Sequence, residues 1–576
     1  MTTDPEIELT ARFRAALTAA LGEPGAHADP LIRHSPFADY QANVALSLGK
    51  QLGLPPRELA ARLVQHLDVT DLCERAEVSG PGFVNCTLRA DWLTAQVAGL
   101  LDDPRLGVTP ARAPETVVVD YSAPNVAKEM HVGHLRTTIV GDAIVRVLEF
   151  LGHRVIRQNH LGDWGTPFGM LIEHLLDIGE RNAVQQLSVG ELNSFYQQAR
   201  AKFDADPVFA DRARQRVVKL QQSELATLEL WRLLVEESTR YFRQVYQRLS
   251  VSLTDGDADG ESRYHPMLDD VANELKVQGI ATISNGALCA FPPGFTGRDG
   301  RPAPMIIRKR DGGYGYAATD LAALRYRVRE LGATRLIYVV GIPQALHLDM
   351  LFAVARQAGW LNGTQAEHAA IGSVLGPDGK ILRTRTGVSI KLIELLDEAV
   401  ARAGKLLADR ADLDDDARAA VARAVGMGAV KYADLSVARD RDYTFDWDRM
   451  LALHGNTGPY LQYATARSRS ILRKAGLPAQ QAAGPVIIGH PAERALVLRL
   501  LSFGSAVHMV GASVEPHRLC GELYELATTF TSFYEQCPVL DADTCTKQSR
   551  LALCGLTERT LSTGLGLLGI DVPDRM

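Results

Sequence analysis

The sequence predicts an α/β fold built around a parallel sheet, with a small N-terminal α+β domain and a C-terminal all-α helical bundle. Three observations lead to this prediction. Short β-branched runs such as ETVVVDYS (115–122) alternate with helical patterns in the middle of the chain. Residues 172–250 show long helical periodicity with little Gly or Pro. From about Lys391 onward the pattern is helical almost to the end.

The N-terminal part mixes two kinds of pattern. Residues 39–53, DYQANVALSLGKQLG, have helical periodicity, whereas residues 82–88, GFVNCTL, form a short apolar run that predicts a strand. The Pro- and Ala-rich segment GVTPARAPE (107–115) predicts a linker. We therefore expect a small domain over residues 1–112.

The central part predicts a strand, a helix and a second strand in succession. The run at 115–122 precedes a helix from about Leu135 to Leu151, and a second strand follows within 153–165. This order is a βαβ unit, the building block of a Rossmann-like sheet. Strand-like runs return at 303–309, 335–341 and 369–376. We expect a Rossmann-like domain over 113–390 with a helical insertion at about 172–255, and a helical domain over 391–576.

Composition excludes several classes of protein. The 576 residues are 46% hydrophobic and 23% charged with a net charge of −6, which excludes a disordered chain or a uniformly basic nucleic-acid binder, but not local basic patches. No apolar run near the ~20 residues of a membrane span is evident, and no signal peptide is expected. Seven cysteines without CxxC spacing argue against disulfides or zinc and favour the cytoplasm, with the thiols buried.

The strongest local motif is the HxGH sequence of His131, Gly133 and His134, which follows a predicted strand and opens a helix. A helix N-terminus attracts phosphate, and two imidazoles at i and i+3 can both donate hydrogen bonds to it. Gly133 lets a base or ribose approach the backbone. The alternatives are a helix cap with two surface histidines, or half of a metal site. The sequence nominates no further ligands, so we expect no protein-bound metal.

The segments VVVDYSAPNVAKEMHVGHLRTTIVGDA and RQNHLGDWGTPFGM resemble the class I aminoacyl-tRNA synthetases, and the arginyl-tRNA synthetase family in particular. The resemblance implies ligation of L-arginine to tRNA(Arg) with ATP and with Mg²⁺ held mainly by phosphates. It also implies a cytoplasmic monomer with no DNA or membrane partner. It continues through GESRYH (260–265), DGGYGYAATDLAA (311–323), VVGIPQALH (339–347), DGKILRTRTGVSIKLIELLDEA (378–399), GNTGPYLQYATARSR (455–469) and the final VPDRM.

A pocket for the arginine substrate is expected around Tyr316 and Asp320. A guanidinium is a planar fork of donors, and a carboxylate is its bidentate acceptor, so Asp320 is the candidate for the guanidinium and Tyr316 for packing on the stem or plane. The alternative for Asp320 is a helix N-cap. The resemblance also implies that Gln344 lines this pocket, and that the amino-acid head group is held by Ser122, Asn125 and His134.

The second signature loop of the family departs from its usual KMSKS form here. Lys380 is present, but Arg383 stands where many relatives have lysine, and Arg385 follows. By resemblance, Lys128, just before the HxGH motif, supplies part of the missing charge; whether Lys128 or Lys380 contributes more stays open. The alternative for this loop is an exposed turn with solvated charges. Pro167, where relatives often have Gln, is expected to have a local effect near the pocket.

The C-terminal region offers candidates for contact with tRNA. Tyr460 and Tyr463 are three residues apart on a predicted helix and precede Arg467, and aromatic rings beside cations suit unstacked RNA bases. The alternative is a core aromatic pair beneath a charged face. The resemblance adds Met576 at the chain's end, and Phe83 and Asn85 for the tRNA elbow.

Three functional hypotheses remain from the sequence. In the first, His131, His134 and Lys128 stabilise phosphate charge in an arginine–tRNA ligase. The second is another HxGH-superfamily nucleotidyltransferase, which leaves the C-terminal helices unexplained. The third is a non-catalytic or specialised paralogue, which would predict damaged motifs; the altered second loop is the one feature in its favour.

Overall fold

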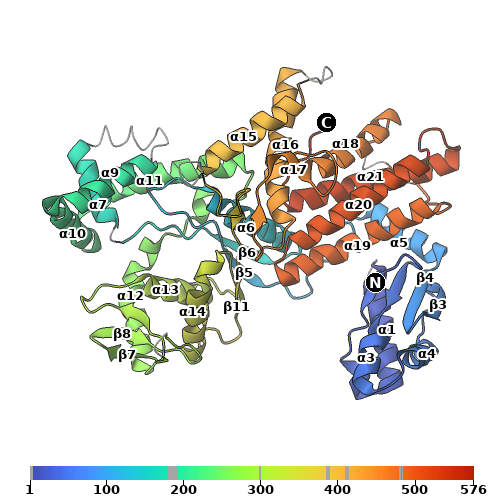
Figure 1. Ribbon diagram of the computed structural model, residues 1–576, viewed down its shortest axis with the longest axis horizontal. Helices are drawn as coiled ribbons and strands as arrows, with labels where there is room; N and C mark the ends of the chain where they lie inside the picture. Colours follow the sequence, from blue (N-terminus) through green and yellow to red (C-terminus); the bar gives the residue numbers. More distant parts are fainter. Residues whose placement is uncertain are drawn as a thin grey trace.

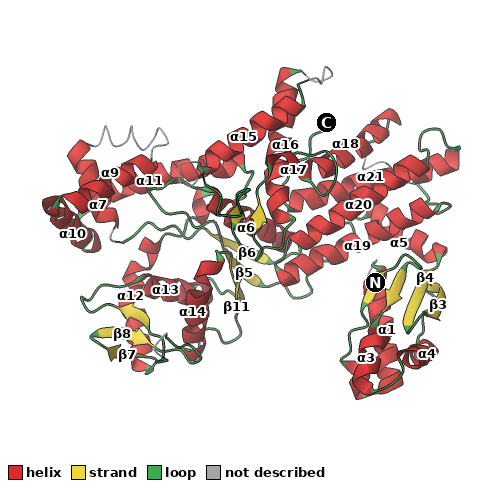
Figure 2. Ribbon diagram, in the orientation of Figure 1, coloured by secondary structure: helices red, strands yellow, loops and turns green. Residues whose placement is uncertain are grey.

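The computed structural model describes residues 4–165, 167–179, 192–297, 300–383, 390–408, 414–478, 482 and 484–576. A small parallel sheet lies at the centre, with an arm of helices on one side and a large group of helices on the other (Figure 1). The N-terminal domain projects below the C-terminal helices, and a mixed lobe lies beneath the helical arm. Helices dominate the fold, as the colouring by secondary structure shows (Figure 2).

The N-terminal domain is a four-stranded antiparallel sheet in the order β1-β2-β4-β3, covered by helices. The segment 39–53, expected to be helical, begins with strand β2, because its first residues pair with both β1 and β4 before the helix starts. The helices are α1 (Pro5–Leu21), α2 (Glu23–Ala26), α3 (Val44–Leu52), α4 (Pro56–His66) and α5 (Ala90–Asp102). The strands are β1 (Ile32–His34), β2 (Tyr40–Ala42), β3 (Cys73–Ser79) and β4 (Phe83–Leu88).

The central sheet is parallel, in the order β11-β10-β5-β6, and contains the predicted βαβ unit. Strand β5 (Thr116–Asp120) is followed by helix α6 (Val132–Phe150) and strand β6 (Arg154–Gln158). The other two strands are β10 (Arg335–Tyr338) and β11 (Gln365–His368). The parallel, helix-flanked sheet confirms the predicted α/β fold class.

One strand of this sheet was assigned wrongly. The run 369–376 was expected to be a strand, but only Val374–Leu375 is one (β12), and it pairs with β13 (Tyr443–Thr444) outside the central sheet. The fourth strand of the sheet is the polar segment Gln365–His368, which none of the apolar patterns indicated. It is an edge strand with no buried residue, so it needs no apolar run.

The run 303–309 forms a strand, but in a separate lobe. That strand is β9 (Met305–Arg308), in a three-stranded antiparallel sheet with β7 (Ala281–Ser284) and β8 (Ala287–Ala290). The apolar core of this lobe continues onto the central sheet, because Leu275, Ile307 and Leu321 lie in one cluster with Val118 of β5 and Leu336 of β10. Its helices are α12 (Leu268–Val277), α13 (Tyr316–Arg329) and α14 (Ala345–Gln357), with 3-10 helices η1 (Asp255–Asp257), η2 (Glu261–Met267) and η3 (Ile342–Gln344) nearby.

The remaining elements are helices, and they lie on two sides of the central sheet. The arm on the left of Figure 1 consists of α7 (Pro167–Ile178), α9 (Leu192–Ala205), α10 (Pro207–Gln221) and α11 (Leu225–Arg248). The C-terminal helices are α15 (Leu392–Leu406), α16 (Asp415–Leu435), α17 (Trp447–Met450), α18 (Gly458–Lys474), α19 (Pro491–Ser513), α20 (His517–Gln536) and α21 (Thr544–Leu567).

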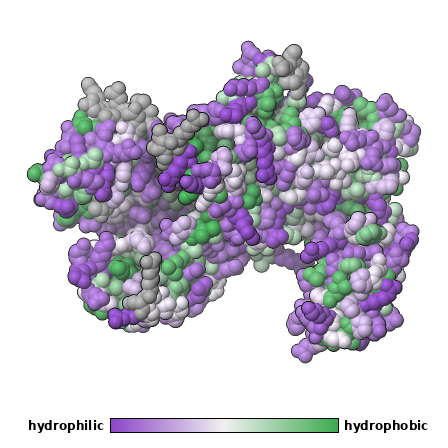
Figure 3. Space-filling view, viewed as in Figure 1, coloured by the Kyte–Doolittle hydropathy of each residue, from purple (hydrophilic) through white to green (hydrophobic). Residues whose placement is uncertain are grey.

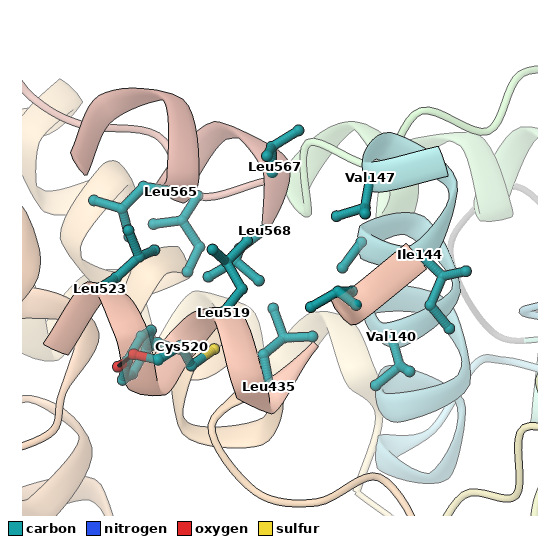
Figure 4. Packing of buried hydrophobic residues seen from close by; sticks show 14 of the residues in the cluster. Val140, Ile144, Val147, Leu435, Leu519, Cys520, Leu523, Leu565, Leu567 and Leu568 are labelled. Carbon is teal, nitrogen blue, oxygen red and sulfur yellow. Dashed lines mark hydrogen bonds between the residues drawn. The ribbon is translucent and has the colours of Figure 1, made fainter. Parts of the chain in front are cut away.

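Helix α6, which begins at the HxGH motif, is anchored to the C-terminal helices. Val140, Ile144 and Val147 of α6 belong to the same apolar cluster as leucines of α16, α20 and the end of α21 (Figure 4). Within this contact, Arg136 donates to Asp434 of α16 at 2.8 Å, and both side chains are almost wholly buried, at 1% and 0% exposure. The position of the HxGH turn is therefore fixed by the C-terminal helices as well as by the sheet.

Two expectations from composition need correction. Helix α19 is long and apolar enough to cross a membrane by length and composition, although no such run was expected; 67% of its most apolar window is buried inside the fold, which is the environment of a core helix. Cys545 is exposed, whereas all seven cysteines were expected to be buried. It lies in the first turn of α21, on the solvent side.

Candidate active site

The two imidazoles of the HxGH motif cap the first turn of α6. His131 is the N-cap residue, and its Nδ1 accepts a hydrogen bond from the backbone N–H of Gly133 at 3.1 Å. The Nδ1 of His134 accepts one from the backbone N–H of His131, also at 3.1 Å. The capping alternative is therefore correct for the Nδ1 atoms, and it leaves both Nε2 atoms for a ligand. No group of three or more potential metal-binding side chains occurs among the described residues.

Both imidazoles are neutral at physiological pH. Burial lowers the pKa of His131, and the charge of Lys128 lowers it further. Burial and, to a smaller extent, His131 lower the pKa of His134 to about 4. Because each Nδ1 accepts a backbone hydrogen bond, each proton resides on Nε2. The turn thus presents two Nε2–H donors at the positive end of the helix dipole, which is an arrangement suited to phosphate.

The pKa of His134 predicts how stability changes with pH. The folded pKa, about 4, lies below the ordinary value of 6.5, so the unfolded chain binds more protons between these two values. Stability should therefore fall as pH drops from 6.5 toward 4. A His134→Gln variant cannot titrate, and it should lose less stability than the parent between neutral pH and pH 5. Urea midpoints at the two pH values measure this; equal losses in both proteins would contradict the neutral imidazole.

The loop between β5 and α6 is strained and held by hydrogen bonds. Ser122, Ala123 and Ala127 have positive φ angles of 70°, 48° and 60°, each at a cost of about 1–3 kcal/mol. Ser122 is buried, and its Oγ contacts the hydroxyl of Tyr246 at 2.8 Å and accepts from Thr138 at 2.9 Å. The Ser122 side chain therefore lies within a buried network, and exposed Asn125 is more accessible to the head group than Ser122 is.

Asp320 of α13 contacts His347 of the neighbouring helix α14. Helix α13 begins at Tyr316 with Gly315 as its N-cap, so the N-cap alternative for Asp320 is wrong. The Oδ2 atom of Asp320 lies 2.6 Å from Nε2 of His347, and the side chain keeps 27% exposure. Tyr316 is 69% exposed, on the same side of the helix one turn earlier, and its ring lies 4.9 Å from that of His347.

A pocket of about 630 Å³ opens beside these residues. Figure 3 shows a recess between the helical arm and the lobe of α12–α14. Burial raises the pKa of Glu261, which lines the pocket, to about 7. Gln344 is exposed at the end of η3, where α14 begins. Other lining residues are Trp164, Pro167, Lys309, Tyr316 and His347.

The HxGH turn and Asp320 lie at the same edge of the sheet. Strands β5, β6 and β10 run parallel, with Asp120 opposite Gln158 and Tyr338, so their carboxyl ends meet there. Hydrogen bonds then join Ser122 through Tyr246 to Asn159. The next residue, His160, has Nε2 3.8 Å from Oδ1 of Asp320.

Sequence reasoning missed several charged residues at this edge. His160 lies between two carboxylates, with Nδ1 3.6 Å from Asp259 and Nε2 near Asp320. Burial alone would lower the pKa of His160, but the surrounding carboxylates, led by Asp259, outweigh it and raise the pKa to about 9. Arg327, fully buried on α13, pairs with Asp120 at 2.7 Å. The block QNHLGDWG contains His160, but only the fold reveals its neighbours.

The second signature loop returns to the HxGH turn. The backbone of Leu392 donates to Met130 at 2.9 Å, and Val132 donates to Ile390 at 3.1 Å. Lys128 is half-buried, with Nζ 4.3 Å from the ring centre of Tyr196 on α9. Of the cations that the sequence nominated in this loop, Lys380 and Arg383 are exposed, and Arg385 lies outside the described residues.

Three of the predicted tRNA contacts lie together. Tyr463, Arg467 and Met576 line one pocket of about 430 Å³, and the guanidinium of Arg467 lies 4.8 Å from the ring centre of Tyr463. Tyr460 lies apart from them: its ring is 5.9 Å from that of Tyr524, and its hydroxyl contacts Thr531 at 3.3 Å. The core alternative therefore describes Tyr460 better than Tyr463.

The two N-terminal candidates lie on one strand. Phe83 and Asn85 are two residues apart on β4, so their side chains share a face of the sheet. Phe83 is half-buried. Asn85 is buried, and its Oδ1 accepts a hydrogen bond from Nε2 of Gln41 at 2.7 Å.

A parallel sheet with a neutral HxGH turn at its carboxyl edge is the arrangement of a class I aminoacyl-tRNA synthetase. A family model for "tRNA synthetases class I (R), catalytic domain" matches residues 96–447. Models for an "Arginyl tRNA synthetase N terminal domain" and a "DALR anticodon binding domain" match residues 8–88 and 461–576.

Whole-chain relatives agree with these models. An arginine–tRNA ligase from Thermobifida fusca is 59% identical over 575 residues, covering 100% of both chains, and one from Synechococcus elongatus is 48% identical over 99% of this chain and 100% of its own. An arginyl-tRNA synthetase structure from Plasmodium falciparum matches with a TM-score of 0.84 and 29% identity over 100% of both chains. This chain belongs to the arginyl-tRNA synthetase family.

Proposed function

We propose that this protein is an arginine–tRNA ligase that activates L-arginine with ATP and transfers the arginyl group to the 3′-terminal ribose of tRNA(Arg). The observation that supports this best is the joint position of two half-sites: the neutral HxGH turn and the carboxylate of Asp320 lie at one edge of the sheet. One half suits phosphate and the other suits a guanidinium.

In the first step, the arginine carboxylate attacks the α-phosphate of ATP in line and pyrophosphate leaves. No protein nucleophile is needed, so the chain contributes position and charge stabilisation. The Nε2–H groups of His131 and His134 donate to phosphate oxygens at the positive end of the α6 dipole, and Gly133 leaves room for the nucleotide. Mg²⁺ neutralises phosphate charge when bound and is held mainly by the phosphates themselves.

The substrate arginine lies between the two half-sites. Asp320 accepts the guanidinium, and exposed Tyr316 packs against it, with Gln344 at the rim. Asn125 is the more accessible contact for the head group at the HxGH end, where Ser122 orders the loop from within. His134 is the third contact for the head group.

Lys128 is the stronger candidate for the pyrophosphate. It lies three residues before His131 and is held against Tyr196, whereas Lys380 lies in an exposed turn. Arg383 and Arg385 extend the positive charge of that loop, whose exit pairs with the HxGH turn.

In the transfer step, the tRNA contacts several domains of the protein. Residues 391–576 bind the anticodon through Tyr463, Arg467 and Met576, with Tyr460 in a supporting position. Residues 1–112 contact the tRNA body through Phe83, with the buried Asn85 behind it held by Gln41. Residues 113–390, including the insertion at 172–255, form the catalytic domain. We infer a cytoplasmic monomer.

A charging assay tests this proposal. Purified protein, Mg-ATP, labelled arginine and total tRNA should give acid-precipitable arginyl-tRNA. A specialised or non-catalytic paralogue would give none above the background without enzyme. Another HxGH nucleotidyltransferase would consume ATP with a different acceptor, and product formed without tRNA would identify it.

A further inference from the structure

The carboxylate of Asp320 is contacted on both oxygens by imidazoles. Nε2 of His347 lies 2.6 Å from Oδ2, and Nε2 of His160 lies 3.8 Å from Oδ1. The two histidines are 16% and 14% exposed, and Asp320 is 27% exposed. One side of the carboxylate therefore remains accessible while its orientation is fixed from the protein side.

His347 also contacts the second residue proposed for the arginine side chain. Its ring lies 4.9 Å from that of Tyr316, at an interplanar angle of 60°. His347 lies in the first turn of α14, and the next residue, Leu348, is buried in the core of the lobe. Since Tyr316 is otherwise largely exposed, the T-shaped contact with the His347 ring is a defined contact that can hold it.

The contact to Oδ2 leaves room for substrate. An ionised carboxylate offers about four lone-pair sites, so Asp320 can accept one hydrogen bond from His347 and still accept two from a guanidinium. The terminal torsion of an aspartate is broad, so a carboxylate without a fixed donor turns readily. Bidentate pairing requires the two planes to be aligned.

We propose that His347 is a positioning residue for arginine recognition, which holds Asp320 and Tyr316 in the orientation that pairs with a guanidinium. This inference rests on the proposed role of Asp320 in binding arginine. An ammonium is a compact point charge and needs no planar alignment, so loss of the His347 contact should weaken arginine use more than lysine use. His347 thereby contributes to specificity rather than to cation attraction in general.

Two substitutions separate the donor from the ring. His347→Phe keeps an aromatic ring beside Tyr316 but removes the N–H, whereas His347→Gln keeps an N–H near the position of Nε2 but removes the ring. We expect His347→Phe to raise the arginine KM at least about tenfold, with the ATP KM unchanged. The arginine KM of His347→Gln should rise much less than that of His347→Phe, because glutamine keeps the N–H donor. His508→Gln is the matched control, since His508 also makes one side-chain contact, at 3.2 Å to Thr109, but on α19.

The assay is tRNA charging at varied arginine, repeated with lysine as competitor, for variants whose thermal unfolding matches the parent. Equal arginine KM values for His347→Phe and the parent, or equal losses for His347→Phe and His347→Gln, would overturn the inference. His347→Ala takes the place of His347→Phe if the larger ring prevents folding, with the same expectation. Asp320→Asn belongs in the same series: if it too leaves the arginine KM unchanged, the proposed arginine site is wrong, and not only the role of His347.

Discussion

Replacing His134 with asparagine should slow arginyl-adenylate formation at least about 100-fold, because one phosphate donor is lost from a preorganised site. The Oδ1 of asparagine can still accept the backbone N–H of His131, as Nδ1 of the imidazole does at 3.1 Å. The Nε2–H that points away from the cap has no equivalent in asparagine. The expected defect is therefore in the chemical step, and single-turnover formation of adenylate with saturating arginine and ATP measures it.

The affinity for tRNA provides the internal control. The candidate tRNA contacts lie on α18 and at the chain's end, so the Kd for tRNA should be unchanged in His134→Asn. His134→Ala should show the same loss of rate together with lower stability, since it removes the capping acceptor as well. Equal losses in adenylate formation and tRNA affinity would show that the HxGH turn is not the phosphate site.

Replacing Asp320 with asparagine should raise the arginine KM at least about 30-fold, because a buried guanidinium would lose its charged partner. Asparagine keeps the size of the side chain and one acceptor oxygen, so the hydrogen bond from His347 can persist. The ATP KM should change little, since the phosphate donors lie on α6. Charging rates at varied arginine and at varied ATP give the two constants.

Asp270 is a suitable control for this substitution. It is an exposed aspartate on α12 of the same lobe, so Asp270→Asn removes the same charge without touching the pocket. An arginine KM that is unchanged in Asp320→Asn, or raised equally in Asp270→Asn, would contradict the assignment of Asp320.

The fold could be predicted from sequence wherever burial dictates the residue pattern. The β5–α6–β6 unit was recognisable because a strand buried on both faces is a continuous β-branched run, such as Val117–Val119. The edge strand Gln365–His368 has no buried residue and therefore no such pattern. Similarly, the strand at Met305–Arg308 was recognisable, but its partner strands are antiparallel and local, which no apolar pattern specifies.

Some residues of the candidate site could likewise be predicted from the sequence, and others could not. The HxGH turn was visible because all its residues are contiguous. The environment of Asp320 was not, because His160, His347 and Asp320 come from three separate segments. The sequence spacing also could not separate Tyr460 from Tyr463. Both rings are half-buried, and they differ in that Tyr460 packs against α20 whereas Tyr463 lies beside Arg467.

A structure of the protein with a non-hydrolysable arginyl-adenylate analogue tests the central claim most directly, since that one molecule contains both a phosphate-like group and a guanidinium. We expect its phosphate mimic to lie within about 3.2 Å of an Nε2 atom of the HxGH turn, with the guanidinium paired to both oxygens of Asp320. A guanidinium bound away from Asp320, or an adenylate group away from His131 and His134, would contradict the claim that these residues form one active site.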